Sequence, residues 1–290
     1  MEDTETTLRS EHLGAELRKL RKRAAKSLEE AAKSIDSGPP KLSKMETGKQ
    51  GCKFEDVAGL LAIYGVGGAQ RKAILAMALE ADKPGWLLRT SAAEQIETLR
   101  RLEQRADSIT VFHPLLIPGL LQTAPYILAV LNEIGGLSQD EAKDRLAARI
   151  QRQDVLRFPV TPFTALIAED ALHHRVGGKQ VLRDQLKYLL EAGGKPKITI
   201  RIVPNLDRGH PGMDGPIVRL NLPDRRGVVH LESREYTHFL ETKRDIDSYD
   251  HVIEQLTAVA LDESASARLI ADVVDGLERN PQDAPTADLA

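Results

Sequence analysis

Helix-breaking residues interrupt the first eighty residues so often that only short helices fit between them. A Gly-Pro-Pro run at residues 38–40, the glycine at position 48 and a glycine-rich break at residues 65–68 divide this part of the chain. Apolar residues recur at helical spacing between the breaks, which indicates helices with one buried face. The pattern predicts an all-α bundle of five short helices over residues 10–82.

Within this bundle, residues 28–42 have the spacing of a helix-turn-helix. Ala32 supplies the small residue that a close helix crossing needs, and Leu42 supplies an apolar contact from the second helix. Asp36 falls at the turn, where the backbone adopts a left-handed conformation that Asp tolerates better than most residues. In such a motif the second helix lies in the major groove of DNA.

Charge is unevenly distributed along the chain. Residues 14–53 hold eleven Lys and Arg against five Asp and Glu, a net charge of +6, so the remainder carries −9 of the total of −3. A basic module next to an acidic body suggests an anionic partner for the first module. A solvated helix face would give the same charge pattern, and both interpretations are open at this point.

The chain changes character after Pro84 and Gly85, which mark a domain boundary. Residues 84–280 mix helical stretches with short segments rich in β-forming residues, which predicts an α+β domain with a small, mostly antiparallel sheet. The strands are expected at residues 163–168, 197–203, 217–222, 228–231 and 237–240. The apolar run at residues 112–123 contains two prolines and a glycine, and we interpret it as a buried crossing segment. The first ten residues and residues 281–290 are expected to be disordered tails.

Several segments resemble known families. LGAELRKLR at residues 13–21, SLEEAA at 27–32 and LSKMETGK at 42–49 resemble the Xre-type, phage-repressor-like helix-turn-helix. PLLIPGLLQTAPY at 114–126, ARIQRQDVL at 148–156 and the turn at 210–216 that leads into 228–232 resemble a large C-terminal domain of unknown function. That domain follows such a module in many actinobacterial regulators. The resemblance implies a DNA-binding transcriptional regulator of antitoxin-like type, often encoded beside a small partner protein.

The resemblance also implies roles for individual residues. Arg21 of the first helix would pair with Glu46 at the end of the recognition helix, as a structural ion pair. Leu28 stands where the family often has Gln, and Pro39 and Pro40 stand where bases are commonly read, so these positions lack hydrogen-bond donors. We therefore expect an affinity dominated by phosphate contacts and sensitive to salt. The DNA-binding residues are predicted to be Pro40, Lys41, Ser43, Lys44, Lys49, Gln50 and Lys53.

No catalytic or metal-binding motif emerges from the remaining polar residues. The candidates are His173 and His174 beside Glu169 and Asp170, His210 near Asp214, and Gly177-Gly178-Lys179. None has metal-ligand or phosphate-loop spacing. Cys52 is interpreted as an inert small residue rather than a redox sensor, and the apolar strip at residues 115–121 as core rather than a partner groove. We expect no enzyme activity, metal or cofactor.

These observations predict a homodimeric DNA-binding regulator. Its N-terminal domain would read an operator in double-stranded DNA, and a partner protein or ligand would act on its C-terminal domain. The alternative is an antitoxin-like, protein-binding scaffold with little DNA function of its own, which the proline pair at positions 39 and 40 favours. The chain has neither an apolar run long enough to span a membrane nor a signal peptide, so a cytoplasmic location without membrane partners is expected.

Overall fold

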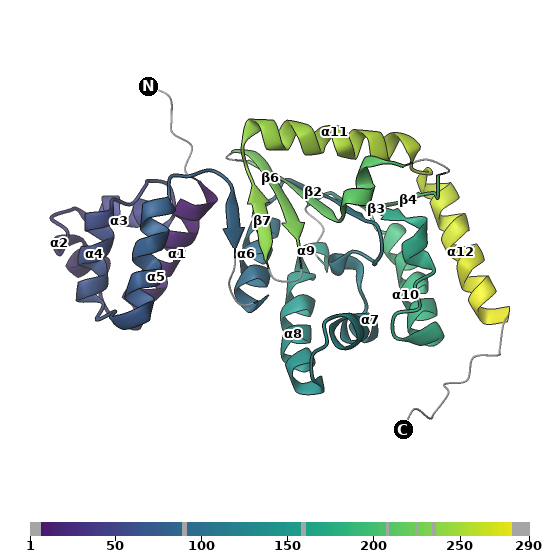
Figure 1. Cartoon of the computed structure of the whole chain (residues 1–290), viewed down its shortest axis with the longest axis horizontal. Coiled ribbons are helices and arrows are strands. Elements are labelled where there is room, and N and C mark those ends of the chain that lie inside the picture. The colour runs from purple at the N-terminus through teal and green to yellow at the C-terminus, as the bar shows by residue number, and fades with distance from the viewer. Residues whose placement is uncertain are drawn as a thin grey trace. The chain divides into compact units, whose positions relative to one another are not determined.

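The computed structural model describes residues 7–88, 92–157, 161–206, 209–223, 225–233 and 236–279. These residues form two compact units (Figure 1). The N-terminal unit comprises the chain as far as Leu88 together with His238–Lys243, and the C-terminal unit comprises the rest. The expected disordered segment at residues 281–290 lies outside the described residues.

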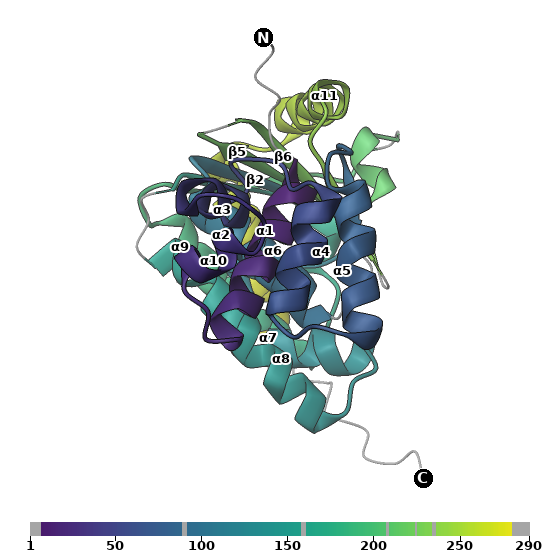
Figure 2. The same ribbon diagram turned by 90° about the vertical axis from the view of Figure 1, so that its left-hand side faces the viewer.

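The N-terminal unit is a helical bundle around one apolar core. Its helices are α1 (Leu8–Arg23), α2 (Leu28–Lys33), α3 (Pro39–Glu46), α4 (Phe54–Ile63) and α5 (Gly68–Glu80). Figure 2 presents this bundle toward the viewer. The fully buried side chains at its centre are Leu13, Leu17, Ala31, Ala32, Leu42, Met45, Val57, Leu60 and Leu61.

The expectation of a disordered tail over the first ten residues is wrong for its last part, because α1 begins at Leu8. The Thr7 hydroxyl accepts a hydrogen bond from the backbone N–H of Ser10 at 3.1 Å, which caps the helix. The Leu8 side chain is buried, and the Thr7 hydroxyl also donates to the carbonyl of Ala81. A cap and a buried anchor therefore order the chain from this point.

A segment from far along the chain completes the N-terminal unit. The Glu241 carboxylate accepts hydrogen bonds from the backbone N–H of Leu8, at 3.1 and 3.2 Å, and from that of Gly85 at 3.3 Å. The short strands β1 (Trp86–Leu88) and β7 (Thr237–Leu240) are neighbours in the strand order. A carboxylate at the first turn of a helix also interacts favourably with the helix dipole. Glu241 therefore caps the first helix of the bundle.

The C-terminal unit is built on a mixed sheet. Its strands are β2 (Ser108–His113), β3 (Phe163–Ala168), β4 (Ile198–Val203), β5 (Ile217–Leu222) and β6 (Arg225–Glu232), in the order β6-β5-β2-β3-β4. β2 pairs with β3 and β3 with β4 in parallel, whereas β5 runs antiparallel to β2 and to β6.

The expectation of a mostly antiparallel sheet is therefore wrong. Two described strands, β1 and β2, were missed in the sequence, and the last two residues of β2 fall within the run interpreted as a crossing segment. β2 lies at the centre of the sheet, between β5 and β3. Long connections that contain helices join β2 to β3 and β3 to β4, and such crossovers permit parallel pairing.

Helices pack on both faces of this sheet. They are α6 (Ala92–Arg105), α7 (Ala124–Ala129), α8 (Gln139–Arg152), α9 (Asp154–Arg157), α10 (Gly178–Gly193), α11 (Lys243–Val259) and α12 (Glu263–Arg279). Figure 1 shows α11 along one face, with α8 and α10 on the other. Arg201 of β4 holds the end of α11, because its guanidinium donates to the carbonyls of Thr257, Ala260 and Leu261 at 2.6–3.0 Å.

The segment that precedes α7 is buried and ordered, as the sequence predicts. The side chains of Ile117, Leu120 and Leu121 are at most 2% exposed, although Leu115 at the start of the apolar strip is 57% exposed. Within this segment lies the short 3-10 turn η1 (Gly119–Leu121). Its buried apolar side chains confirm the core interpretation for this part of the strip.

Glutamine side chains supply the hydrogen bonds that the irregular backbone around η1 cannot make internally. The buried Gln185 side chain accepts from the N–H of Thr123 and donates to the carbonyl of Leu121, both at 2.7 Å. The Gln153 amide donates to the carbonyls of Gly119 and Gln122 at 3.0 and 2.7 Å. Pairing of this kind is what allows such backbone to be buried.

Candidate nucleic-acid interface

The helix-turn-helix consists of α2, a turn and α3. α2 begins with a capping box in which the Ser27 N–H donates to the Glu30 carboxylate at 2.8 Å and the Glu30 N–H donates to the Ser27 hydroxyl at 3.1 Å. This bonding lowers the pKa of Glu30. Ala32, before the turn, has no exposed surface, and Leu42, after the turn, is fully buried. The positions chosen from sequence spacing therefore have the burial that the motif requires.

The turn itself uses a left-handed residue. Asp36 has φ +47°, a conformation that costs a non-glycine residue conformational energy. Ser37 and Gly38 then lead into α3, whose first two positions are prolines. Proline is tolerated there because the N–H groups of a first helical turn have no partner within the helix.

Replacing Asp36 by glycine should relieve this strain. We expect Asp36→Gly to raise the free energy of unfolding by about 0.5–1 kcal/mol and Asp36→Val to lower it by a similar or larger amount. Urea denaturation followed by circular dichroism would measure both changes. If both variants were less stable than the parent chain, backbone strain would not control stability at this turn.

A bidentate ion pair holds α3 against α1. The Arg21 guanidinium donates to the two carboxylate oxygens of Glu46, from Nε at 2.6 Å and from Nη2 at 2.8 Å. The same guanidinium donates to the carbonyl of Lys26 at 3.0 Å, which ties the loop before α2 into the contact. The Glu46 side chain is 3% exposed and that of Arg21 13%, and the bond to Glu46 raises the pKa of Arg21. The two side chains expected to pair are thus in contact, and the pair is buried and bidentate.

The exposed face of α3 is formed by side chains at helical spacing, namely Pro40, Ser43, Lys44 and Thr47. Leu42, Met45 and Glu46 face the core, which leaves this face free to approach another molecule. Its chemistry combines a proline ring, the Ser43 hydroxyl and the Lys44 ammonium group. Lys can donate to guanine O6 and N7, and Ser or Lys can donate to phosphate.

Thr47 was missed in the sequence. It lies at the C-cap of α3, one turn beyond Ser43 and Lys44, and its spacing from Pro40 could have identified it. Its hydroxyl donates to the carbonyls of Ser43 and Lys44 at 2.8 and 3.2 Å. The side chain therefore closes the helix end while it remains on the exposed face.

Lys41 occupies a different place from the other predicted DNA-binding residues. Its Nζ lies 2.9 Å from Oδ2 of Asp56 in the first turn of α4, and its side chain is partly buried. Lys49 and Lys53 are exposed on the connection between α3 and α4, with Gln50 partly buried between them. The structure thus leaves the side chains of Lys44, Lys49 and Lys53 exposed, whereas it holds the Lys41 ammonium against α4.

Cys52 lies in the same connection and is buried. Burial, together with the carboxylates of Asp56 and Asp82, raises the pKa of its thiol to about 12. Because the thiolate is the reactive form, the thiol is inert at neutral pH. The inert interpretation of this cysteine is supported and the redox-sensor interpretation is not.

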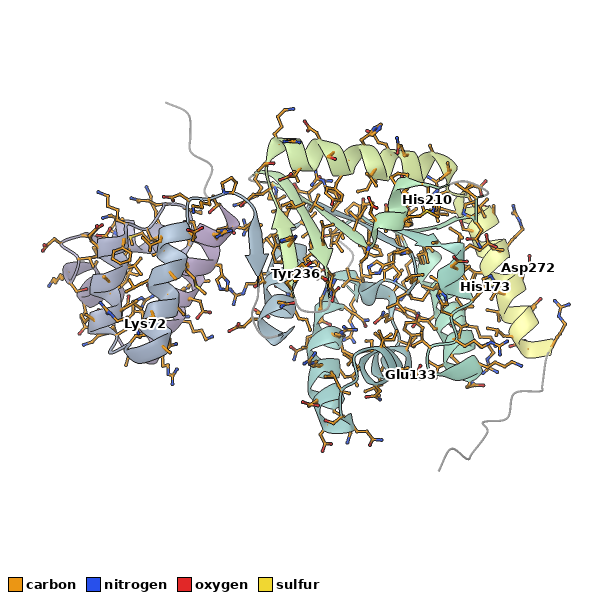
Figure 3. The ribbon with its side chains drawn as sticks, viewed as in Figure 1. Lys72, Glu133, His173, His210, Tyr236 and Asp272 are labelled. Atoms are coloured by element: carbon orange, nitrogen blue, oxygen red, sulfur yellow. The ribbon has the colours of Figure 1, made fainter. Side chains whose placement is uncertain are left out.

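Among the candidate histidines, His173 and His210 lie at separate places (Figure 3). His174 Nδ1 lies 3.0 Å from the carbonyl of Leu115, whereas His210 Nδ1 accepts from the N–H of Gly212 at 3.2 Å. Glu169 and Asp170 both accept hydrogen bonds from Asn205, at 2.9 Å. Across the residues that the structure describes, no group of three His, Cys, Asp or Glu side chains could hold a metal ion. Gly177 and Gly178, both at positive φ, form the start of α10, as expected for a plain helix start.

Comparison with protein families assigns both units. Residues 12–74 match a family model described as Helix-turn-helix domain, and residues 96–272, more than half of the chain, match the Domain of unknown function (DUF5753). No curated protein and no solved structure matches the chain. In the described part of the chain, no helix combines the length and the apolar character that crossing a membrane would require. The chain therefore belongs to the DUF5753 family and carries a helix-turn-helix domain ahead of that domain.

Proposed function

We propose that this protein is a cytoplasmic transcriptional regulator whose Xre-type helix-turn-helix reads an operator and whose DUF5753 domain receives the regulating signal. The observation that carries the proposal is the exposed face of α3, flanked by Lys49 and Lys53, on a helix that the Arg21–Glu46 pair holds in place. The match to a helix-turn-helix domain supports DNA as the partner. We further propose a homodimer without enzymatic activity, because an operator is usually read by two copies of such a module.

Salt dependence would identify the phosphate contacts. We expect Lys49→Ala to weaken binding equally to two duplexes, one with the DNA upstream of the gene that encodes this protein and one with a scrambled sequence. The slope of log affinity against log salt should fall in magnitude by about one, since each phosphate contact contributes roughly 0.9 to that slope. Fluorescence anisotropy at several salt concentrations would measure this. Lys72→Ala removes the same charge from the exposed side of α5 and is the matched control (Figure 3).

A second pair of variants separates base reading from support of the fold. Lys44→Ala should reduce the preference for the duplex from upstream of the protein's own gene over the scrambled duplex. The reduction should be about 1–3 kcal/mol if Lys44 donates to a guanine. Lys41→Ala should leave that preference unchanged and instead lower stability slightly, because its ammonium is held by Asp56. Equal binding to both duplexes by the parent chain would contradict operator reading.

The alternative is an antitoxin-like scaffold that binds a small protein and has little DNA function. The observation in its favour is the pair of prolines in the first turn of α3, which offers no backbone or side-chain donor at the positions closest to DNA in related motifs. Stable co-purification with a small protein, combined with no affinity for either duplex at low salt, would favour this candidate.

A further inference from the structure

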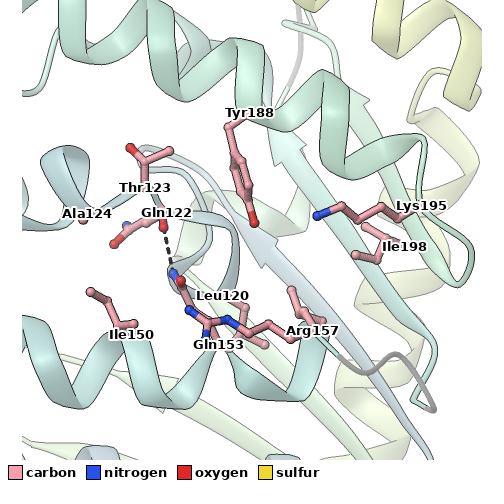
Figure 4. Close-up of a pocket in the computed structure, with 11 residues that line it drawn as sticks. Leu120, Gln122, Thr123, Ala124, Ile150, Gln153, Arg157, Tyr188, Lys195 and Ile198 are labelled. Carbon is pink, nitrogen blue, oxygen red and sulfur yellow. Dashed lines mark hydrogen bonds between the residues drawn. The ribbon is translucent and has the colours of Figure 1, made fainter.

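A pocket of about 360 Å³ opens in the C-terminal unit among η1, α8, α9, α10 and the first residue of β4 (Figure 4). This volume lies within the range of small-molecule sites. The lining includes four aliphatic side chains, Leu120, Ile150, Leu156 and Ile198, of which Ile198 lies beside Lys195 in Figure 4. An organic molecule could bury a hydrocarbon or aromatic body against these side chains.

The walls of the pocket are fixed by hydrogen bonds. Gln153 binds the carbonyls of Gly119 and Gln122, and the Gln122 amide donates to the carbonyl of Ile117 at 2.8 Å. The Gln153 bonds hold η1 against the end of α8. A pocket wall that is fixed in this way lowers the ordering cost of binding.

The charged residues of the pocket lining are basic. Among the residues that the structure describes, the lining contains Arg157 and Lys195 and no Asp or Glu. The Lys195 ammonium lies 5.7 Å from the centre of the Tyr188 ring, and the two side chains point toward the same space in Figure 4. Arg157 has one carboxylate neighbour outside the lining, Asp154, at 3.2 Å on the exposed surface.

This charge is unusual for its surroundings. The chain outside residues 14–53 carries a net charge of −9, yet the described lining of this pocket holds two cations and no acid. A bound anion would neutralise the Lys195 ammonium and would compete with Asp154 for Arg157, and an apolar body attached to it would cover the aliphatic side chains of the lining. A fully hydrophilic anion would leave those side chains exposed to water.

We infer that this pocket binds a small organic acid, with its carboxylate between Arg157 and Lys195 and its apolar body against Leu120, Ile150, Leu156 and Ile198. The inference rests on the proposed function only for its regulatory meaning, because it names the class of molecule that would act on the DUF5753 domain. Binding of the acid can be measured without DNA.

The test is isothermal titration of the full chain with acids of increasing width and with their neutral counterparts. Hexanoate, octanoate, 3-phenylpropanoate and indole-3-acetate would each be compared with the alcohol of the same carbon skeleton. We expect at least one acid to bind at least about tenfold more tightly than its alcohol, as a charge-assisted contact implies. Absence of binding by all four acids up to about 10 mM, or equal affinity for acid and alcohol, would overturn the inference.

Variants locate the site. The double variant Arg157→Gln/Lys195→Gln should lose about tenfold in affinity for the acid and should keep its affinity for the alcohol. Arg101→Gln/Lys143→Gln removes the same charge from exposed positions on α6 and α8 outside the pocket and should bind the acid like the parent chain. An equal loss of acid affinity in both double variants would show a general charge effect. It would overturn the assignment of the acid to this pocket. Both proteins would first be checked by thermal unfolding.

The acid titration and the DNA measurement fail independently. If the parent chain bound no DNA, the proposed function would fall while acid binding remained. If DNA binding were specific and no acid bound, the pocket assignment would fall while the regulator remained.

Discussion

Arg152→Met should lower the free energy of unfolding by about 3–5 kcal/mol, because it leaves a buried carboxylate without its partner. Arg152 of α8 donates to Glu103 of α6 from Nε at 2.6 Å and from Nη2 at 2.7 Å. The Glu103 side chain is 1% exposed and that of Arg152 14%. Chemical denaturation followed by circular dichroism would measure the loss.

A matched control separates this effect from the removal of a surface charge. Arg101→Met breaks an exposed pair with Glu97 on the same helix α6 and should cost less than about 1 kcal/mol. The double variant Arg152→Met/Glu103→Leu should recover most of the loss, since a buried ion pair can often be replaced by apolar groups of similar volume. A double variant as unstable as Arg152→Met would contradict the idea of a stranded charge.

The loss in Arg152→Met should also depend on pH. Burial raises the pKa of Glu103, and the attraction of Arg152 opposes this rise. Without Arg152, the folded-state pKa of Glu103 lies above the unfolded value of about 4.3, so stability is lost as pH rises above that value.

Two histidines change the pH dependence of the loss in Arg152→Met in the same direction as Glu103. Burial, and then the charge of Arg152, lowers the pKa of His113 to about 4 and that of His230 to about 3. A group with a depressed folded pKa loses stability as pH falls, and removing Arg152 relieves part of this depression. The difference between Arg152→Met and the parent chain should therefore be smaller at pH 5 than at pH 8. An equal difference at both pH values would contradict this account.

Local rules were sufficient for the helix-turn-helix. Ala32, Asp36 and Leu42 could be placed from spacing because residue size, tolerance of positive φ and apolar character act within one turn and its two helices. Arg21 and Glu46 came from resemblance to a family, and the structure brings their side chains together. The ion pair between Lys41 and Asp56 left no such signal, because it depends on how α3 and α4 pack.

Long-range features could not be predicted from the sequence. The pairing of β2 with β3 depends on the path of the connection between them, and the pattern at residues 108–113 merges with the proline-containing run that follows. Glu241 reaches Leu8 across 233 positions in the chain. The pocket combines residues from η1 to β4, none of which has a recognisable motif. These features arise from tertiary packing, which periodicity does not encode.

Gly14→Ala should be strongly destabilising and should also weaken DNA binding. Gly14 lies in the middle of α1, where a Cβ would overlap the carbonyl oxygen of Met45 and lie 3.1 Å from the carbonyl carbon of Glu46. Both atoms belong to the backbone of α3, so the helix would have to move away as a unit. We expect a loss of about 2–4 kcal/mol in the free energy of unfolding, at the upper end of overpacking effects.

Gly276→Ala is the matched control, because Gly276 also lies inside a helix, α12, and a Cβ there would meet nothing within 4 Å. That substitution should stabilise the chain by about 0.5–1 kcal/mol through helix propensity. Opposite signs for the same chemical change would show that the close approach of α1 and α3 decides the outcome.

The same variant, Gly14→Ala, should also change DNA binding, because it displaces α3. Met45 and Glu46 lie on the core side of α3, and a shift at their backbone carries Ser43 and Lys44 with it. At a temperature where Gly14→Ala remains folded, its preference for the upstream duplex should fall while Gly276→Ala keeps the parent preference in the same anisotropy measurement. Unchanged DNA preference in a folded Gly14→Ala protein would show that the position of α3 does not set DNA recognition. That result would favour the antitoxin-like scaffold function.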